Sequence, residues 1–257
     1  MKFSKYHGAG NDFVIIDDRD ESIGHLDATV IKAICDRHFG VGADGLMLLR
    51  NDSEVDFKMV YFNSDGNQSS MCGNGGRCLV AFAKRLGVID TDTEFSAIDG
   101  RHHATLLSED SVSLQMNDVA SLEVLDKSSV FLDTGSPHVV VTRKNIKEMD
   151  LVAEAQVIRN SERFVTDGVN VNFVELIDEA IHIRTYERGV ENETLACGTG
   201  VTAAAIALHY LGLSGESVNV KAIGGSLSVR FKFSDNMYQD VWKTGPIKHV
   251  FEGTWIG

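Results

Sequence analysis

The sequence has little that would make a membrane-embedded or disulfide-bonded protein. Its 257 residues include only 2 prolines and 4 cysteines, and it has no low-complexity segment. No apolar run approaches the ~18 residues of a membrane-spanning helix, and the first residues lack the apolar centre of a signal peptide. Four cysteines in a chain this long do not make a disulfide framework. We therefore expect a globular cytoplasmic protein with no membrane partner.

Positive charge is also in short supply. Lys and Arg number 24 against 37 Asp and Glu, a formal net charge of −13. Non-specific binding to nucleic acid needs a basic face, so we expect no nucleic-acid partner. The acidic balance leaves room for a small cationic or zwitterionic substrate.

Motifs for metals and nucleotides are missing as well. There is no CxxC: Cys72 and Cys78 are too far apart for it, and Cys35 and Cys197 have no second cysteine nearby. No GxxxxGK[ST] occurs. The GxGxxG match at 40–45 follows a helix pattern and precedes a strand pattern, the reverse of a dinucleotide fold. We predict no metal site and no nucleotide cofactor.

The most informative feature that is present is a duplicated motif. Residues 72–75 read CGNG, and residues 197–200, 125 positions later, read CGTG. Tyr61 and Tyr186 each precede their cysteine by 11 positions, and a glycine follows each cysteine by 15. An apolar helical run follows each cysteine. The repeat indicates two half-sites, with one thiol on each side of a substrate.

Strand patterns surround these two helices. They cover 3–7, 13–17, 45–50, 55–62, 93–98, 102–107 and 111–116 in the first half, and 130–133, 138–141, 171–177, 181–186, 218–222, 226–233, 237–242 and 247–251 in the second. Two shorter helices begin after Asp27, with Gly40 as a left-handed stop, and after Asp150, reaching about Arg159. Strands around one long helix in each half predict an α+β duplication.

We expect the domain boundary in the polar link 117–126. The first domain would be 1–117, carrying the first cysteine, and the second 118–257, carrying the other. The C-terminal strand, 247–257, could pack with the first domain.

The position of each thiol suggests reactivity. The N-terminus of a helix presents unpaired N–H groups and favours negative charge, which lowers the pKa of a thiol and can also bind a carboxylate. A buried filler role is the alternative for any single cysteine, and we assign it to Cys35 and Cys78. A filler role does not readily explain why Cys72 and Cys197 have the same flanking residues at the same spacing.

We expect a set of polar residues to gather around these motifs: Asn11, Asn63, Asn170, Glu187, Arg188 and His138, which ends the turn Gly135-Ser136-Pro137-His138. Asn offers donors and an acceptor to an ammonium or carboxylate, and Arg pairs with a carboxylate. Taken singly, each Asn could instead be a turn or cap residue, and the His could be structural.

Together these motifs resemble the diaminopimelate epimerase family. The matching stretches are 5–13 (KYHGAGNDF), 62–66 (FNSDG), 71–78 (MCGNGGRC), 186–189 (YERG), 196–200 (ACGTG), and the closing GP at 245 and VFEG at 250–253. The resemblance implies two pseudo-symmetric domains, each a curved, mostly antiparallel sheet wrapped around a central helix, with the site in the cleft between them.

The resemblance also implies cofactor-independent epimerisation of LL-2,6-diaminopimelate to meso-diaminopimelate, a step of lysine and peptidoglycan-precursor synthesis. Cys72 and Cys197 would be the two proton-transfer groups, tuned by His138 and Glu187. The implied substrate-binding residues are Asn11, Asn63, Gly73, Asn74, Ser136, Asn170, Glu187, Arg188, Gly198 and Thr199. An exposed sheet edge would allow a homodimer.

Two positions depart from the family pattern. Some members carry Gln at the position of Gly45, and the turn before His138 often has Asn where this chain has Ser136. Both changes fall on implied substrate contacts rather than on the thiols. Two other functions remain open: a related racemase or isomerase of the same fold, and a thiol redox protein in which Cys72 and Cys197 form a reversible disulfide.

Overall fold

The structure is a computed structural model that describes residues 1–24 and 26–257. The chain divides into two compact units. Unit 1 consists of Met1–Leu114 together with Gly245–Gly257, and unit 2 is Gln115–Thr244. Because unit 2 is one continuous segment, the last residues of the chain return to the unit in which the chain began.

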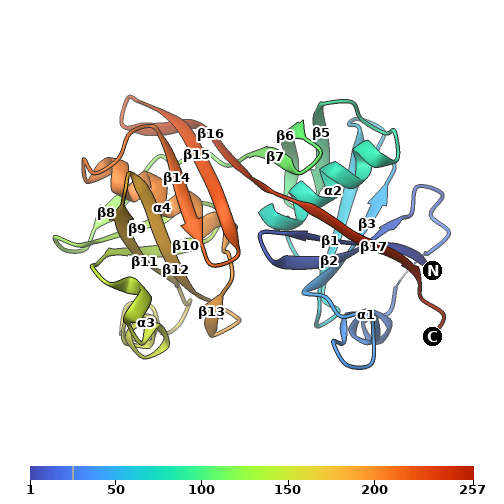
Figure 1. The fold of residues 1–257 in the computed structure, drawn as a ribbon, viewed down its shortest axis with the longest axis horizontal. Coiled ribbons are helices and arrows are strands. Elements are labelled where there is room, and N and C mark those ends of the chain that lie inside the picture. The colour runs from blue at the N-terminus through green and yellow to red at the C-terminus, as the bar shows by residue number, and fades with distance from the viewer. Residues whose placement is uncertain (25) are drawn as a thin grey trace. The chain divides into compact units, whose positions relative to one another are not determined.

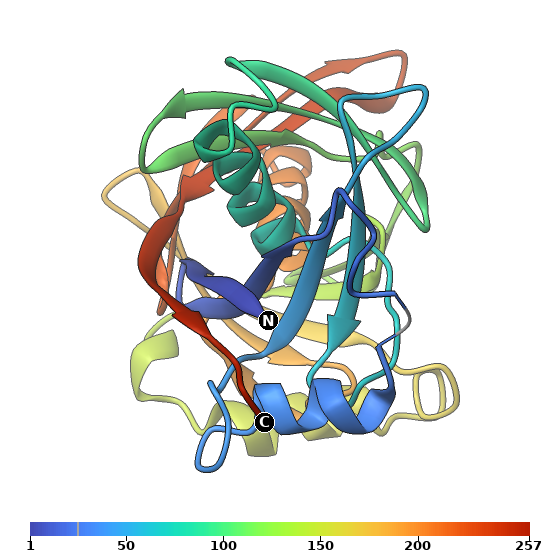
Figure 2. The same cartoon turned by 90° about the vertical axis from the view of Figure 1, so that its right-hand side faces the viewer.

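Unit 1 contains two helices and a set of mostly antiparallel strands. Its elements are β1 (Lys2–Gly8), β2 (Asn11–Asp17), α1 (Ala28–Cys35), β3 (Gly45–Arg50), β4 (Phe57–Asn63), α2 (Gly73–Arg85), β5 (Asp92–Ala97), β6 (Gly100–Ser108), β7 (Ser111–Gln115) and β17 (Lys248–Thr254). Strands β2–β3 and β4–β5 are parallel neighbours, while β1–β2, β3–β4, β5–β6 and β6–β7 are antiparallel. Strand β17 pairs antiparallel with β1 (Figure 2).

Unit 2 repeats this order of pairing. Its elements are β8 (Leu122–Val124), β9 (Ser129–Asp133), β10 (Pro137–Thr142), η1 (Ile146–Glu148), α3 (Leu151–Arg159), β11 (Asn170–Ile177), β12 (Ala180–Glu187), β13 (Asn192–Thr194), α4 (Gly198–Tyr210), β14 (Ser217–Ala222), β15 (Gly225–Ser234) and β16 (Met237–Pro246). Here β10–β11 and β12–β14 are parallel, and β9–β10, β11–β12, β14–β15 and β15–β16 are antiparallel. The predicted α+β duplication is confirmed.

Each unit is built around one central helix, α2 or α4 (Figure 1). Both helices have 13 residues, both follow a cysteine in extended conformation, and both are followed by a glycine with φ of 70° two residues beyond their end. Helix α4 is buried without interruption from Gly200 to Leu208, as a helix enclosed by strands must be. None of the helices in the described residues is long and apolar enough to cross a membrane.

The strand register shows where the repeat is inexact. In unit 1, Leu46 pairs with Phe62, whereas Val171, which lies 125 positions after Leu46, pairs with Tyr186. Tyr186 therefore takes the place of Phe62, not of Tyr61. Tyr61 packs edge-on against a β2 phenylalanine beside α2, while Tyr186 belongs to the core cluster on the α3 side. A slip of one residue turns a side chain to the other face of a sheet, so the two equally spaced tyrosines are not structural equivalents.

The predicted end of α1 was wrong. The helix begins after its Asp27 cap as predicted but ends at Cys35, and the left-handed glycine of the following loop is Gly42, with φ of 77°. Gly40 has a different reason to be glycine, because a Cβ there would collide with the carbonyl oxygen of Ala33.

Two short strands were not predicted. Strand β8 lies inside the link 117–126 and pairs with β9, and β13 pairs with the end of β12. Each has three residues, too few for an alternating pattern to stand out from a polar loop.

Candidate functional site

Both motif cysteines stand where the sequence predicted them, as the N-cap residues of α2 and α4. Neither cysteine side chain makes a cap hydrogen bond in its helix. Cys72 is partly buried, Cys197 is 7% exposed, and all four cysteines are free thiols. We call the surroundings of these residues the Cys72 site, in unit 1, and the Cys197 site, in unit 2.

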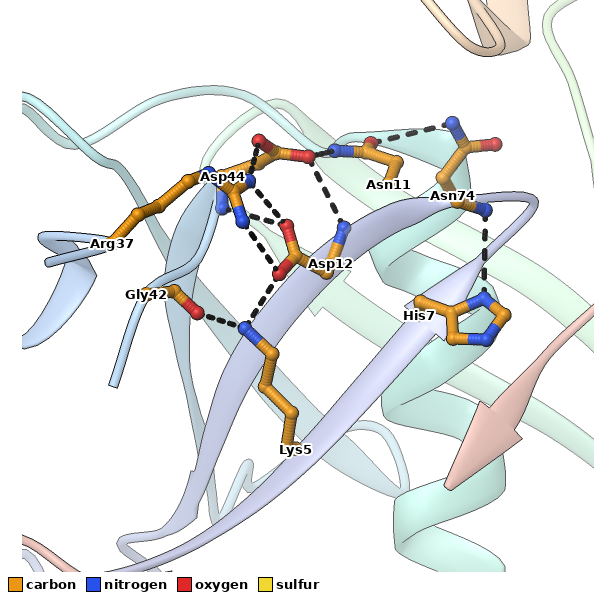
Figure 3. A network of polar contacts seen from close by, with 9 residues as sticks. Lys5, His7, Asn11, Asp12, Arg37, Gly42, Asp44 and Asn74 are labelled. Carbon is orange, nitrogen blue, oxygen red and sulfur yellow. Dashed lines mark hydrogen bonds and ion pairs between the residues drawn. The ribbon is translucent and has the colours of Figure 1, made fainter. Parts of the chain in front are cut away.

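In the Cys72 site, an asparagine side chain faces the thiol. The Oδ1 atom of Asn11 accepts from the Sγ of Cys72 at 3.6 Å and from the Nδ2 of Asn74 at 3.3 Å. The Nδ2 of Asn11 donates to Asp44 Oδ2 at 2.5 Å (Figure 3). Because a carboxylate only accepts, Asp44 fixes the Asn11 amide with its oxygen toward the thiol.

An ionic network stands behind Asn11 (Figure 3). Lys5 Nζ lies 2.6 Å from Asp12, and Arg37 reaches Asp12 at 2.8 Å and Asp44 at 2.7 Å. Burial alone would raise the pKa of Asp12, but hydrogen bonds from Arg37 and Lys5 lower it to about 2. Asp12 is therefore ionised at neutral pH, and the network anchors the β2 residue that faces Cys72.

A buried cation lies beneath the first turns of α2. The Arg77 guanidinium is fully buried and donates to two neutral oxygens, Gly73 O at 3.1 Å and Asn74 Oδ1 at 3.0 Å. Its Nε has no hydrogen-bond partner within residues 1–24 and 26–257. Burial lowers the pKa of Arg77, whereas the neighbouring thiols of Cys78 and Cys72 would raise it when ionised. Arg77 thus fixes the Asn74 amide and sets a positive charge near Cys72.

The Cys197 site is a chain of neutral polar groups. The Sγ of Cys197 lies 3.5 Å from the hydroxyl of Thr199, and that hydroxyl lies 2.9 Å from His138 Nε2. The other ring nitrogen of His138 lies 2.9 Å from the amide nitrogen of Asn172, whose oxygen accepts from the Thr185 hydroxyl at 2.9 Å. His138 was predicted near the thiol, and it reaches the thiol through Thr199.

Two opposing influences act on the Cys197 thiol. Burial, and then the negative charge of Glu187, raise the pKa of Cys197 to about 12. The Thr199 hydroxyl, the backbone N–H of Gly200 and the charge of Lys243 act in the other direction. A thiolate at Cys197 would form only if bound substrate or a moved charge strengthened the influences that lower its pKa.

His138 is held as a neutral ring. It is fully buried, and burial together with the nearby charge of Arg188 lowers the pKa of His138 to about 3. At neutral pH the ring therefore carries one proton and no charge. It can donate one hydrogen bond and accept another.

Asn170 joins two of the other predicted binding residues. Its Oδ1 accepts from the backbone N–H of Arg188 at 2.8 Å, and its Nδ2 donates to the Ser136 hydroxyl at 2.8 Å and to Pro137 O at 3.1 Å. The Arg188 side chain also donates to Asp167 O at 2.9 Å. The structure thus brings Asn170, Ser136 and Arg188 into one cluster in unit 2, with Glu187 beside it at the end of β12.

The remaining predicted residues are placed less tightly. Gly73 and Gly198 are the first residues of their helices. Asn63 ends β4 opposite Gly45. A Cβ at Gly45 would lie 2.5 Å from Phe62 O and 2.6 Å from the Tyr61 ring, so a Gln side chain has no room here unless both the β4 backbone and Tyr61 move.

Sequence reasoning missed four contributors: Arg77, Asp44, Asn172 and Thr185. Arg77 lies inside the motif at 71–78. Asn172 follows Asn170 at a spacing of two, so the two asparagines point to the same side of β11. That alternation of polar residues within an otherwise apolar strand was the available signal.

Comparison with known proteins shows which family this chain resembles along its length. The sequence pattern of the family described as diaminopimelate epimerase matches residues 3–122 and 130–250. The diaminopimelate epimerase of Flavobacterium psychrophilum is 49% identical over 99% of this chain and 100% of its own length. That of Aquifex aeolicus is 40% identical over 98% of this chain and 97% of its own.

Solved structures with low sequence identity share the fold of this chain. A PhzF-family phenazine biosynthesis protein of Bacillus anthracis has a TM-score of 0.73 at 13% identity, covering 100% of this chain and 99% of its own. A probable proline racemase from Agrobacterium radiobacter has a TM-score of 0.71 at 16% identity, covering 99% and 92%. With the duplicated cysteine-capped helices and full-length relatives taken together, this chain belongs to the diaminopimelate epimerase family.

Proposed function

We propose that this protein epimerises LL-2,6-diaminopimelate to meso-diaminopimelate, the reaction named for its family, by proton transfer between two cysteines. One of Cys72 and Cys197, as a thiolate, removes the α-proton, and the thiol of the other returns a proton to the opposite face. The electron pair of the broken C–H bond forms the new one. After one inversion the two sulfurs have exchanged protonation states, so the reverse reaction uses them in swapped roles. The proposal needs no metal and no organic cofactor.

The observation that carries this proposal is the matching position of the two thiols. Each caps a central helix of its unit, where N–H groups and the helix dipole favour negative charge. The same N–H groups suit the substrate α-carboxylate, whose charge must be held while the α-carbon loses its proton.

Other residues would bind the rest of the substrate. Asn11, Asn63 and Asn74 in unit 1, and Ser136, Asn170, Glu187, Arg188 and Thr199 in unit 2, offer the donors and acceptors that ammonium and carboxylate groups need. Gly73 and Gly198 allow close approach of backbone to ligand. His138 would act on the thiols rather than on the substrate, whereas Glu187 would act on both.

The deciding experiment follows hydrogen at the α-carbon. LL- and meso-diaminopimelate are incubated separately in deuterium oxide with the purified protein, without reductant or pyridoxal phosphate. We expect deuterium to enter at the inverted centre in step with epimerisation. Dithiol turnover without any exchange would instead support the thiol redox alternative.

The two cysteines are then tested singly. Cys72→Ala and Cys197→Ala should each abolish epimerisation while circular dichroism and unfolding midpoint stay near those of the unmodified protein. Near-normal turnover by either variant would refute the two-cysteine assignment. Proline, offered as a second substrate, tests the alternative of a racemase for smaller amino acids.

A homodimer in the cytoplasm, expected from the sequence, belongs to the same proposal. Sedimentation equilibrium at several protein concentrations tests the first part. A single species of 28.1 kDa at all of them would exclude the dimer.

A further inference from the structure

The Cys197 site contains polar side chains at places that unit 1 fills with apolar ones. His138 and Asn172 lie 125 positions after Phe13 and Met47, in matching strands (138 − 13 = 172 − 47 = 125). The Met47 side chain occupies the space beside Gly75 in the first turn of α2, and Asn172 occupies the space beside the corresponding glycine of α4. Packing alone is satisfied by the apolar pair, so the polar pair in unit 2 needs another explanation.

The orientation of the Asn172 amide is fixed by the backbone. Its Nδ2 lies 3.3 Å from the carbonyl oxygen of Val139, which can only accept a hydrogen bond. The NH₂ group must therefore be on that side, with the oxygen toward the Thr185 hydroxyl at 2.9 Å. The same NH₂ group lies 2.9 Å from His138 Nδ1. That ring nitrogen must accept.

This fixes the direction of the rest of the chain. A neutral His138 that accepts at Nδ1 carries its proton on Nε2 and donates it to the Thr199 hydroxyl oxygen at 2.9 Å. The hydroxyl hydrogen of Thr199 is then free to point at the Cys197 sulfur, 3.5 Å away. A hydrogen bond of this direction stabilises a sulfur that carries negative charge.

We propose that Asn172, braced by Thr185, is a positioning residue that selects the Nε2–H form of His138, so that Thr199 donates to Cys197 and favours its thiolate. The inference rests on the proposed two-cysteine reaction, in which Cys197 must hold a negative charge for half of each cycle. Asn172 touches neither the sulfur nor the substrate in this role, and it acts through three successive hydrogen bonds.

Charged groups around the chain set the background against which it acts. Glu187 opposes the thiolate of Cys197 and Lys243 supports it, while Arg188 is the charge that disfavours a protonated His138. The variants below leave these three residues unchanged, so a shift can be assigned to the chain itself.

The first test reads the tautomer of His138 in the unmodified protein. Nuclear magnetic resonance of the full protein with isotope-labelled histidine reports which ring nitrogen is protonated, and His138→Phe identifies the signal. We expect a neutral Nε2–H ring for His138 at every pH at which the protein is folded. A proton on Nδ1, or titration near neutral pH, would overturn the proposal.

The second test measures the reactivity of the Cys197 thiol in a Cys72→Ala background, from the rate of its alkylation at a fixed pH followed by peptide mapping. Thr199→Val should raise the thiol pKa by about one unit, seen as an alkylation rate about tenfold slower, since a hydrogen bond to a charged group is lost, and Thr199→Ser should restore it. Asn172→Met, which installs the residue that unit 1 uses, should raise it by less.

The double variant Thr199→Val/Asn172→Met decides whether Asn172 acts through Thr199. We expect the pKa shift of Thr199→Val alone, because the chain is already broken at its last bond. Additive shifts, or no shift in Asn172→Met, would contradict the proposal. Thr142→Val, which removes a hydroxyl bond to Ser128 O elsewhere on β10, is the matched control and should change nothing.

The His138 tautomer and the Cys197 thiol pKa are both measured without substrate, so these results do not depend on the proposed reaction. Loss of deuterium exchange in the unmodified protein would sink the proposed function and leave the hydrogen-bond chain intact. Failure of the tautomer or pKa tests would sink the role of Asn172 alone.

Discussion

The Cys72 and Cys197 sites place a thiol on the same backbone feature and surround it with different chemistry. Beside the first turn of α2, unit 1 has the apolar side chains of Phe13 and Met47. The polar contact to the thiol comes from Asn11, which is anchored by a network of ion pairs. Beside α4, unit 2 has His138 and Asn172, both neutral and buried. The Cys72 thiol thus contacts an amide that is anchored by ions, and the Cys197 thiol lies at the end of a chain of neutral hydrogen-bonding groups.

The difference shows what a duplicated fold conserves. The order of strand pairing, the helix length and the cysteine at each N-cap are common to both units. The contacts of each sulfur depend on side chains at a few positions, and these can diverge without disturbing the helix. A base and an acid that exchange roles need equivalent positions, but they do not need identical surroundings.

Exchanging the two sets of side chains gives the largest expected effect. Phe13→His with Met47→Asn places polar groups in a site of unit 1 that is built for apolar ones, and it should lower the free energy of unfolding by about 3–5 kcal/mol. The reverse exchange, His138→Phe with Asn172→Met, should cost less, about 1–2 kcal/mol, since the apolar pair already fits this fold. Urea unfolding measures both. Equal costs would mean that the two sites are not specialised.

The ionic network behind Asn11 comes next. Asp12 has its pKa lowered to about 2, below that of an unfolded chain, so its stabilisation is present above about pH 4 and is lost as pH falls through 2. Asp12→Asn should lower the free energy of unfolding at pH 7 by about 2 kcal/mol, and the difference should shrink on acidification. Asp90→Asn, at an exposed ion pair, is the control and should change it by less than about 0.5 kcal/mol. A difference that is constant with pH would contradict the assignment.

Arg77 tests whether charge tunes Cys72. Arg77→Met removes the buried cation, so we expect the thiol pKa of Cys72 to rise by about one unit and kcat to fall about tenfold. Stability should change little, because an incompletely paired buried charge is replaced by an apolar chain. Arg85→Met, at the exposed end of the same helix, serves as control. An unchanged rate of Cys72 alkylation in Arg77→Met would show that the charge of Arg77 does not affect the Cys72 thiol.

The smallest effect should come from the other two cysteines. Burial raises the pKa of Cys35 to about 11 and that of Cys78 to about 12, and neither thiol stands at the N-terminus of a helix. Cys35→Ala and Cys78→Ala should keep activity within about twofold of the unmodified protein. A large loss in Cys78→Ala would show that the Cys72 site extends one helical turn further than we describe.

How much could be predicted from sequence depended on the range of the interactions. The capped helices, the strands around them and the cysteine positions follow from local patterns, so the β3 span and the start of α3 were predicted to the residue. The strand register that separates Tyr61 from Tyr186 depends on pairing between distant residues. The partners of Arg77 and Asn172 depend on side-chain packing under a helix, which no spacing in the sequence encodes.

The pairing of the last strand with the first affects how the protein is made. Strand β17 completes unit 1 beside β1, and the amino group of Met1 donates to Trp255 O at 2.7 Å. A ribosome therefore delivers every residue of unit 2 before it delivers the strand that closes unit 1. Unit 2 can fold as a continuous segment during synthesis, while β1 in the Cys72 unit has no partner along one edge until β17 has been made.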